Sequence, residues 1–114
     1  MKGLLLAAAL TLTVGAAVAE TLVPGETTVV TSSFCRSAEA PREVMRVYEA
    51  EGYTASLPVF TKHLLLGECI RITAEIVPVE VVYEAADRSA RIIKVEHPTK
   101  KGQFVYMLTM RYKL

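Results

Sequence analysis

The stretch Gly67–Ile76, with the sequence GECIRITAEI, decides the fold. Apolar residues occupy its even-numbered positions from 70 to 76, and Arg71, Thr73 and Glu75 lie between them. Successive side chains of a β-strand point to opposite faces, so this period of two predicts a strand with one face in the core. We therefore expect Ile72 to be buried and Arg71 to be exposed.

The two cysteines of the chain are Cys35 and Cys69, and Cys69 begins this strand. In an exported protein, two cysteines predict one disulfide. A bridge that closes a loop of this length stabilises a fold by about 4 kcal/mol in the chain-entropy model. The alternative is a thiol pair that binds metal or performs redox chemistry, but such pairs usually have the close spacing C-x-x-C.

Residues 1–19 have the pattern of a cleaved signal peptide. Lys2 precedes an apolar run, and Ala17-Val18-Ala19 has the small-x-small spacing of a cleavage site. The run is shorter than the roughly 20 residues of a transmembrane helix. We expect a mature domain of residues 20–114, exported to the periplasm or secreted, with no stable membrane insertion after cleavage.

The sequence before Gly67 predicts a short strand and one helix. Residues 27–31 are β-branched and favour a strand. A helix should follow, with Ser37 as its cap, Pro41 in its first turn and Gly52 at its end. Its inward side would carry Val44, Met45, Val47 and Tyr48. Residues 52–67 are apolar without a clear period, and we expect two short strands there, around 57–60 and 63–66.

The sequence after Gly67 is typical of further strands. The inward parity changes at Val77-Pro78, which predicts a bulge or bend within one long strand. A three-residue loop after Asp87 would pair Asp87 with Arg91, Glu84 with Lys94 and Tyr83 with Val95. A second turn follows at 98–102. The last strand should point Phe104, Tyr106, Leu108, Met110 and Tyr112 inward, and Met107, Thr109, Arg111 and Lys113 outward.

These elements predict an α+β fold. One N-terminal helix would pack on a curled antiparallel β-meander of four or five strands, in a small SH3-like or partly open barrel with one disulfide. Curvature is expected because the change of parity within the long strand requires a bend.

Charge singles out one surface. Without the first 19 residues the chain carries 12 basic and 12 acidic side chains, so no general attraction to nucleic acid is expected. Four bases follow Glu96 without an acid, at Lys100, Lys101, Arg111 and Lys113. They are candidates for binding another envelope protein or an anionic polymer. The alternative, which we favour, is a solvated turn beside a charged edge strand that discourages aggregation.

No motif indicates catalysis or a cofactor. No serine lies in a G-x-S-x-G elbow, and Asp87 is the only aspartate. We expect a non-catalytic binding module of the cell envelope. One alternative is a metal-handling periplasmic protein that uses His63, His97 and exposed methionine sulfur, although no H-x-x-x-H or C-x-x-C spacing is present. Another is a small secreted hydrolase inhibitor that inserts a rigid loop at 52–67 into its target.

Overall fold

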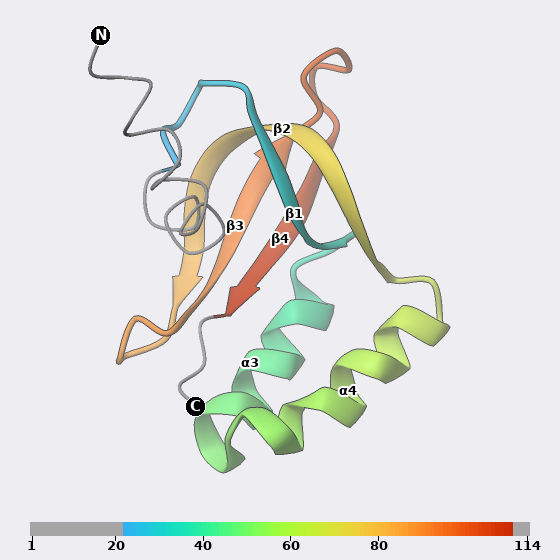
Figure 1. Cartoon of the computed structure of the whole chain (residues 1–114), viewed down its shortest axis with the longest axis vertical. Helices are drawn as coiled ribbons and strands as arrows, with labels where there is room; N and C mark the ends of the chain where they lie inside the picture. The colour runs from blue at the N-terminus through green and yellow to red at the C-terminus, as the bar shows by residue number, and fades with distance from the viewer. Residues whose placement is uncertain (1–21, 111–114) are drawn as a thin grey trace, which may run out of the picture.

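Four antiparallel strands close into a barrel in the computed structural model, which describes residues 22–110 (Figure 1). Two helices follow the first strand and lie below the barrel in this view. The α+β class and the antiparallel sheet are thus confirmed. The predicted disulfide between Cys35 and Cys69 is confirmed as well. The elements are β1 (Thr28–Cys35), α3 (Glu39–Glu51), α4 (Tyr53–Leu65), β2 (Cys69–Glu84), β3 (Ala90–Glu96) and β4 (Phe104–Met110).

The predictions for the signal peptide at 1–19 and for Arg111, Tyr112 and Lys113 fall outside the described residues. Within residues 22–110, no helix is long and apolar enough to span a membrane.

β2 is the long bent strand that the change of parity predicts. Its first half pairs with β1, from Cys35 opposite Cys69 to Thr28 opposite Ile76. Its second half pairs with β3, and the register shifts between Pro78 and Glu80 and again before Tyr83. A single strand therefore serves two neighbours, and the barrel closes where β1 pairs with β4 (Figure 1).

The sheet formed by β3 and β4 is buried on both faces. Inside the barrel, Ile93, Val95 and Met107 pack with residues of β1 and β2. On the other face, Ile92 and Leu108 pack against both helices. The prediction that Met107 points outward to solvent is therefore wrong. Met107 does lie on the face opposite Leu108, but that face is the interior of the barrel, and its side chain is 1% exposed.

The predicted register of the β2–β3 hairpin is also wrong. Glu84 lies opposite Arg91 and Tyr83 opposite Ile92, so the partners differ from those expected by three residues. The loop holds four residues, 86–89, because the N–H of Ala85 donates to the carbonyl of Ala90 across 2.9 Å. Arg88 adopts a positive φ of 64° within this loop. The sequence did not predict this conformation, because residues other than glycine seldom adopt a positive φ.

α3 matches the predicted helix except at its start. It ends at Gly52, whose φ of 99° is accessible to glycine at little cost. Ala38 occupies the N-cap position without a side-chain hydrogen bond. The prediction that Ser37 caps the helix is therefore wrong. The helix follows β1, in agreement with the strand predicted at 27–31, so the description of an N-terminal helix does not hold.

α4 replaces the two short strands predicted within residues 52–67. Its inner side places Ser56 and His63 in buried positions, while Val59 and Phe60 pack against the core beneath β3 and β4. Helix packing on α3 overrides the weak helix propensity of a segment that contains Pro58.

Candidate interaction surfaces

The first half of β2 is open. Among residues 22–110, the edge of Cys69–Ile76 that faces away from β1 pairs with no strand, because β3 begins its pairing only at Val77. Ile70 and Ile72 lie on the same face as their cross-strand partners, which are buried in β1. Yet Ile70 is 55% exposed and Ile72 is 40% exposed. The prediction that Ile72 is a core residue is wrong, because this end of the inner face is left uncovered.

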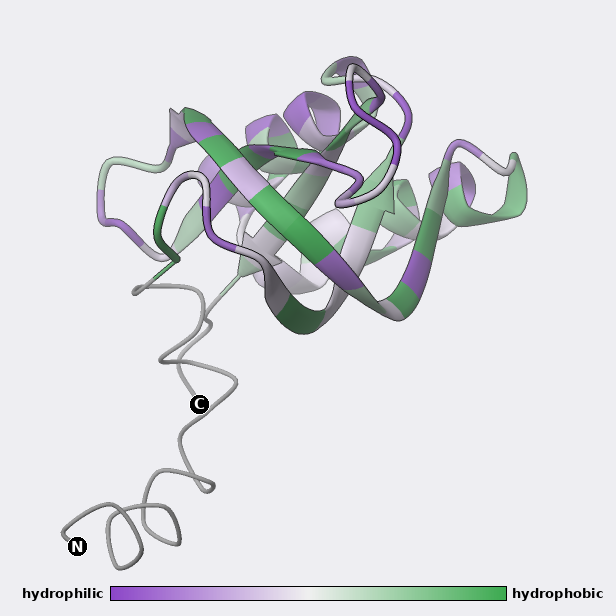
Figure 2. Ribbon diagram, turned by 90° about the horizontal axis from the view of Figure 1, so that it is seen from above, coloured by the Kyte–Doolittle hydropathy of each residue, from purple (hydrophilic) through white to green (hydrophobic). Residues whose placement is uncertain are grey.

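The outer face of the same strand segment is polar. Nη1 of Arg71 donates to Oγ of Ser33 across 3.2 Å, and the hydroxyls of Thr73 and Thr31 lie 2.6 Å apart. Arg71 is exposed, as predicted. Viewed from above, β2 crosses the front of the barrel with hydrophobic and hydrophilic bands alternating along it (Figure 2). We call Cys69–Ile76, with its unpaired edge and its two exposed isoleucines, the open segment of β2.

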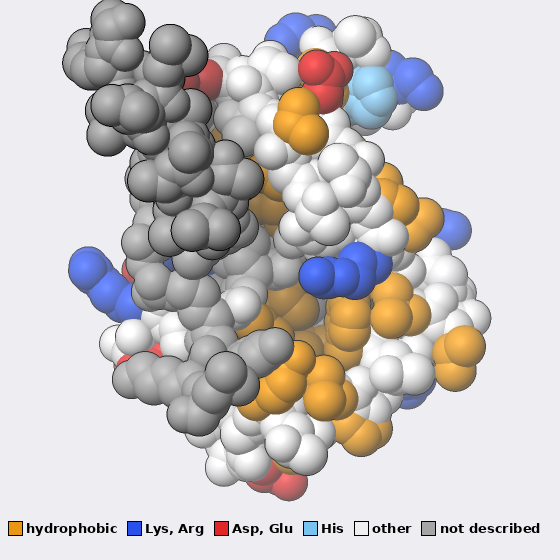
Figure 3. Space-filling model, in the orientation of Figure 1, with side chains coloured by type: hydrophobic (Ala, Val, Ile, Leu, Met, Phe, Trp, Pro, Cys, Tyr) orange, Lys and Arg blue, Asp and Glu red, His pale blue; other side chains and the backbone are white. Residues whose placement is uncertain are grey.

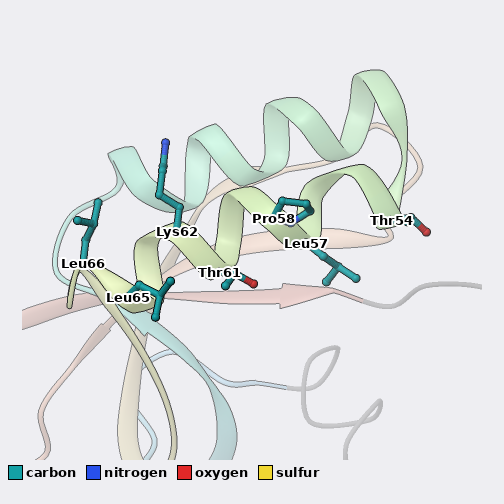
Figure 4. Close-up of a pocket in the computed structure, with 7 residues that line it drawn as sticks. All are labelled: Thr54, Leu57, Pro58, Thr61, Lys62, Leu65 and Leu66. Carbon is teal, nitrogen blue, oxygen red and sulfur yellow. The ribbon is translucent and has the colours of Figure 1, made fainter.

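A second apolar surface lies on the outer side of α4. An open groove there is lined by residues three or four positions apart, which share one face of a helix. Figure 4 shows them as two rows, with Leu57, Thr61 and Leu65 along one side of the helix. Leu65 is 83% exposed and Leu66 is 64% exposed. The α4 stripe, as we name it, comprises Thr54, Leu57, Pro58, Thr61, Lys62, Leu65 and Leu66.

The two surfaces are close in the chain, since Leu66 is followed by Gly67, Glu68 and the open segment. Figure 3 shows hydrophobic side chains gathered at the lower right of the molecule, where α4 and the first half of β2 lie in Figure 1. The α4 stripe was not predicted from the sequence. The spacing of its members from position 54 to 66 was the available signal, but it was hidden because the opposite side of the same helix is also apolar.

His63 lies between two carboxylates. Nε2 contacts Oε1 of Glu43 on α3 at 2.7 Å, and Nδ1 contacts Glu68. Nζ of Lys62 reaches the same Glu43 at 3.3 Å. Hydrogen bonding from His63, and then from Lys62, lowers the pKa of Glu43 below its ordinary value. This cluster joins both helices to the residue that precedes Cys69.

The basic turn predicted after Glu96 is only partly within the described residues. Lys100 and Lys101 are exposed in the turn between β3 and β4. Nζ of Lys101 lies 4.0 Å from Glu96, and the N–H of Gly102 donates to the same carboxylate across 2.7 Å. Because Arg111 and Lys113 are not described, the binding stripe of four bases stays a prediction.

The histidines are not brought together, and the methionines considered as metal ligands lie in different environments. Nδ1 of His97 accepts from the N–H of Thr99 across 3.2 Å within its own turn. Met45 and Met107 are buried in separate cores. The described part of the chain contains no group of three or more His, Cys, Asp or Glu side chains arranged to hold a metal ion.

The disulfide joins Cys35 to Cys69 across 34 positions and is buried with Ala40.

Comparisons with protein families, with curated proteins and with solved structures gave no match, so the function is argued from these surfaces alone.

Proposed function

We propose that the protein is a non-catalytic binding module of the cell envelope, which takes up an extended segment of another protein along the open segment of β2. One observation carries the proposal. Ile70 and Ile72 remain exposed on the inner face of a strand whose second edge has no partner within residues 22–110.

An unpaired strand edge presents N–H and C=O groups in a row, and these groups can bind a further strand. The side chains of Ile70 and Ile72 would meet every second residue of that strand. A suitable partner therefore has an extended segment with apolar residues at alternate positions. The open segment of β2 is held in place by β1, since Phe34, the cross-strand partner of Ile70, is buried in the interior of the barrel.

The proposed location rests on the predicted signal peptide and on the disulfide. Disulfides persist in oxidising compartments, so the Cys35–Cys69 bridge is consistent with the periplasm or the extracellular space. As part of the same proposal, we regard the four-stranded barrel as a small barrel of the SH3-like type. Protein recovered from the exported fraction should begin at Glu20 and contain no alkylatable thiol, and intact mass measurement tests both points.

The alternative functions have less support. The inhibitor hypothesis depended on a rigid loop at 52–67, and α4 occupies most of that range. The metal hypothesis depended on available histidines, but both ring nitrogens of His63 already contact carboxylates. A binding module requires only the exposed edge and side chains described above.

Site-specific photo-crosslinking tests the proposal in the exporting cell. A photoreactive residue at position 72 should capture a partner, whereas the same residue at Val29, which is exposed on β1, should not. With a segment of the captured partner supplied as a peptide, backbone amides within 70–75 should exchange hydrogen more slowly, because they gain inter-strand hydrogen bonds. Equal capture from both positions, or unchanged exchange within 70–75, would contradict the proposal.

A further inference from the structure

We infer that a second copy of this chain packs on the α4 stripe, so that the protein forms an antiparallel two-fold dimer. This inference is independent of the proposed function, because it concerns a different surface. It begins from the composition of α4, whose two opposite sides are both apolar. An apolar stripe on a helix normally faces a packing partner. Here the inner side packs on α3 and the sheet, and the outer side is open.

The shape of the outer side favours a second copy over an unrelated partner. The row Leu57–Thr61–Leu65 reads the same in both directions along the helix (Figure 4). Leucines lie about 6 Å on either side of Thr61, since each helical residue rises about 1.5 Å. A two-fold axis beside Thr61 would therefore place Leu57 of one copy against Leu65 of the other. Such an interface uses the same patch on both subunits, as two-fold dimers require.

The centre of the row allows close approach. Thr61 is smaller than the leucines on both sides, so the helices can approach to the 8–10 Å that is typical of packed pairs. Each protruding leucine then enters the groove of the opposite copy. Leu65 is the more exposed of these two leucines, at 83% against 40% for Leu57.

Charge is consistent with self-association. Lys62 is the only charged member of the α4 stripe, and its Nζ lies 3.3 Å from both carboxylate oxygens of Glu43 in its own chain. Two copies can therefore meet near their axis without facing uncompensated cations. The same pairing reduces any attraction to an anionic membrane or an acidic peptide. Contact through one 13-residue helix per copy is small, so we expect a dissociation constant on the order of 10 µM.

Sedimentation velocity of the exported, oxidised protein, from about 1 µM to about 1 mM, brackets that value. The wild type should pass from monomer to dimer. Leu65→Lys should raise the dissociation constant at least about tenfold, because it places a charge in the apolar contact. Val29→Lys is the matched control on an exposed apolar residue of β1, and its dimerisation should be unchanged.

A charge exchange tests the antiparallel geometry. In the double variant Leu57→Glu/Leu65→Lys, the new carboxylate of each copy would face the new ammonium group of the other, so dimerisation should recover relative to Leu65→Lys alone. Circular dichroism of every variant confirms that it is folded. A wild type that stays monomeric to about 1 mM, a Leu65→Lys variant that still dimerises, or a double variant without recovery would each overturn the inference. So would binding of the monomer to phosphatidylglycerol vesicles that Leu65→Lys abolishes, since the stripe would then be a membrane contact.

Ile70→Ser distinguishes this inference from the proposed function, because Ile70 belongs to the open segment and leaves position 72 for the photoreactive residue. Ile70→Ser should abolish partner capture from position 72 and leave dimerisation unchanged, whereas Leu65→Lys should do the reverse.

Discussion

Nε2 of His63 on α4 lies 2.7 Å from Oε1 of Glu43 on α3, and the other ring nitrogen contacts Glu68. A neutral imidazole carries one N–H, so both contacts can be hydrogen bonds donated by the ring only when it is an imidazolium. The His63 side chain is buried, and its contacts with Glu43 and Glu68 place this cluster at the junction of the helix pair with β2. The cluster therefore ties the two helices to the strand that carries the open segment.

The first prediction concerns stability in acid. Because the pKa of Glu43 is lowered below its ordinary value of 4.5, its stabilising contribution is present above that value and is lost as the pH falls through the folded-state pKa. The free energy of unfolding in urea should therefore decrease from about pH 5 towards about pH 3, on the basis of this direction. Glu43→Gln should flatten the decrease, and Glu39→Gln, exposed on the same helix, should not. Identical pH profiles for the wild type and Glu43→Gln would contradict the assignment.

The second prediction concerns alkaline pH. The hydroxyl of Tyr83 donates to Glu49 on α3, and this hydrogen bond, followed by burial, raises the pKa of Tyr83 above its ordinary value of 10.0. A raised pKa gives a contribution that is present below the unfolded-state pKa and is lost as the pH rises through the folded-state pKa. Tyr83→Phe should flatten the loss of stability above about pH 10. It should also remove tyrosinate absorbance that develops above about pH 10 in an alkaline titration, because the pKa of Tyr83 is raised above its ordinary value.

The sequence was sufficient for the elements whose signals are local. Alternation in 70–76 and the change of parity at Val77-Pro78 predicted the long bent strand, and Gly52 predicted the end of the first helix. The disulfide followed from the cysteine count and the predicted export. The residues that determine the strand and the helix end lie within those elements or directly beside them. The disulfide could be predicted because the chain contains only two cysteines.

The failures at Ile72, at Met107 and in α4 have a common physical cause, because they depend on which faces neighbouring elements cover. Alternation placed Ile72 on the correct face but could not show that this face is open at one end of the barrel. Met107 appeared to point to solvent because the sequence does not reveal a second packed layer. α4 has apolar residues on two sides and Pro58 in its interior, so it shows neither a clear helical period nor strong helix propensity.

The third prediction tests these different burials with the same substitution. Ile92 is completely buried in β3, so Ile92→Ala should reduce the free energy of unfolding by about 2–5 kcal/mol through lost contacts and a cavity. Ile72→Ala should cost about 1 kcal/mol or less, because much of its side chain already contacts water. Urea unfolding of both variants measures the difference. A cost for Ile72→Ala equal to that of Ile92→Ala would show that the inner face is covered at this end.

The fourth prediction concerns the bridge. Cys35 and Cys69 are directly opposite each other in β1 and β2, and the loop that they close contains both helices. Without the bridge the unfolded chain regains the freedom of that loop, so Cys35→Ala/Cys69→Ala should lower the free energy of unfolding by about 4 kcal/mol at neutral pH. The wild type measured with excess reductant is the control for the substitutions themselves, and its free energy of unfolding should fall by a similar amount.

Reduction of the bridge should be slow without denaturant, because both cysteines are buried beside Ala40, Phe60 and Leu64. A reductant reaches the sulfurs only when α3 and α4 move away from the strands. Rapid reduction of the folded protein would show that the helix pair leaves the barrel readily, and an unchanged unfolding curve after reduction would show that the strands hold this loop closed without the bridge.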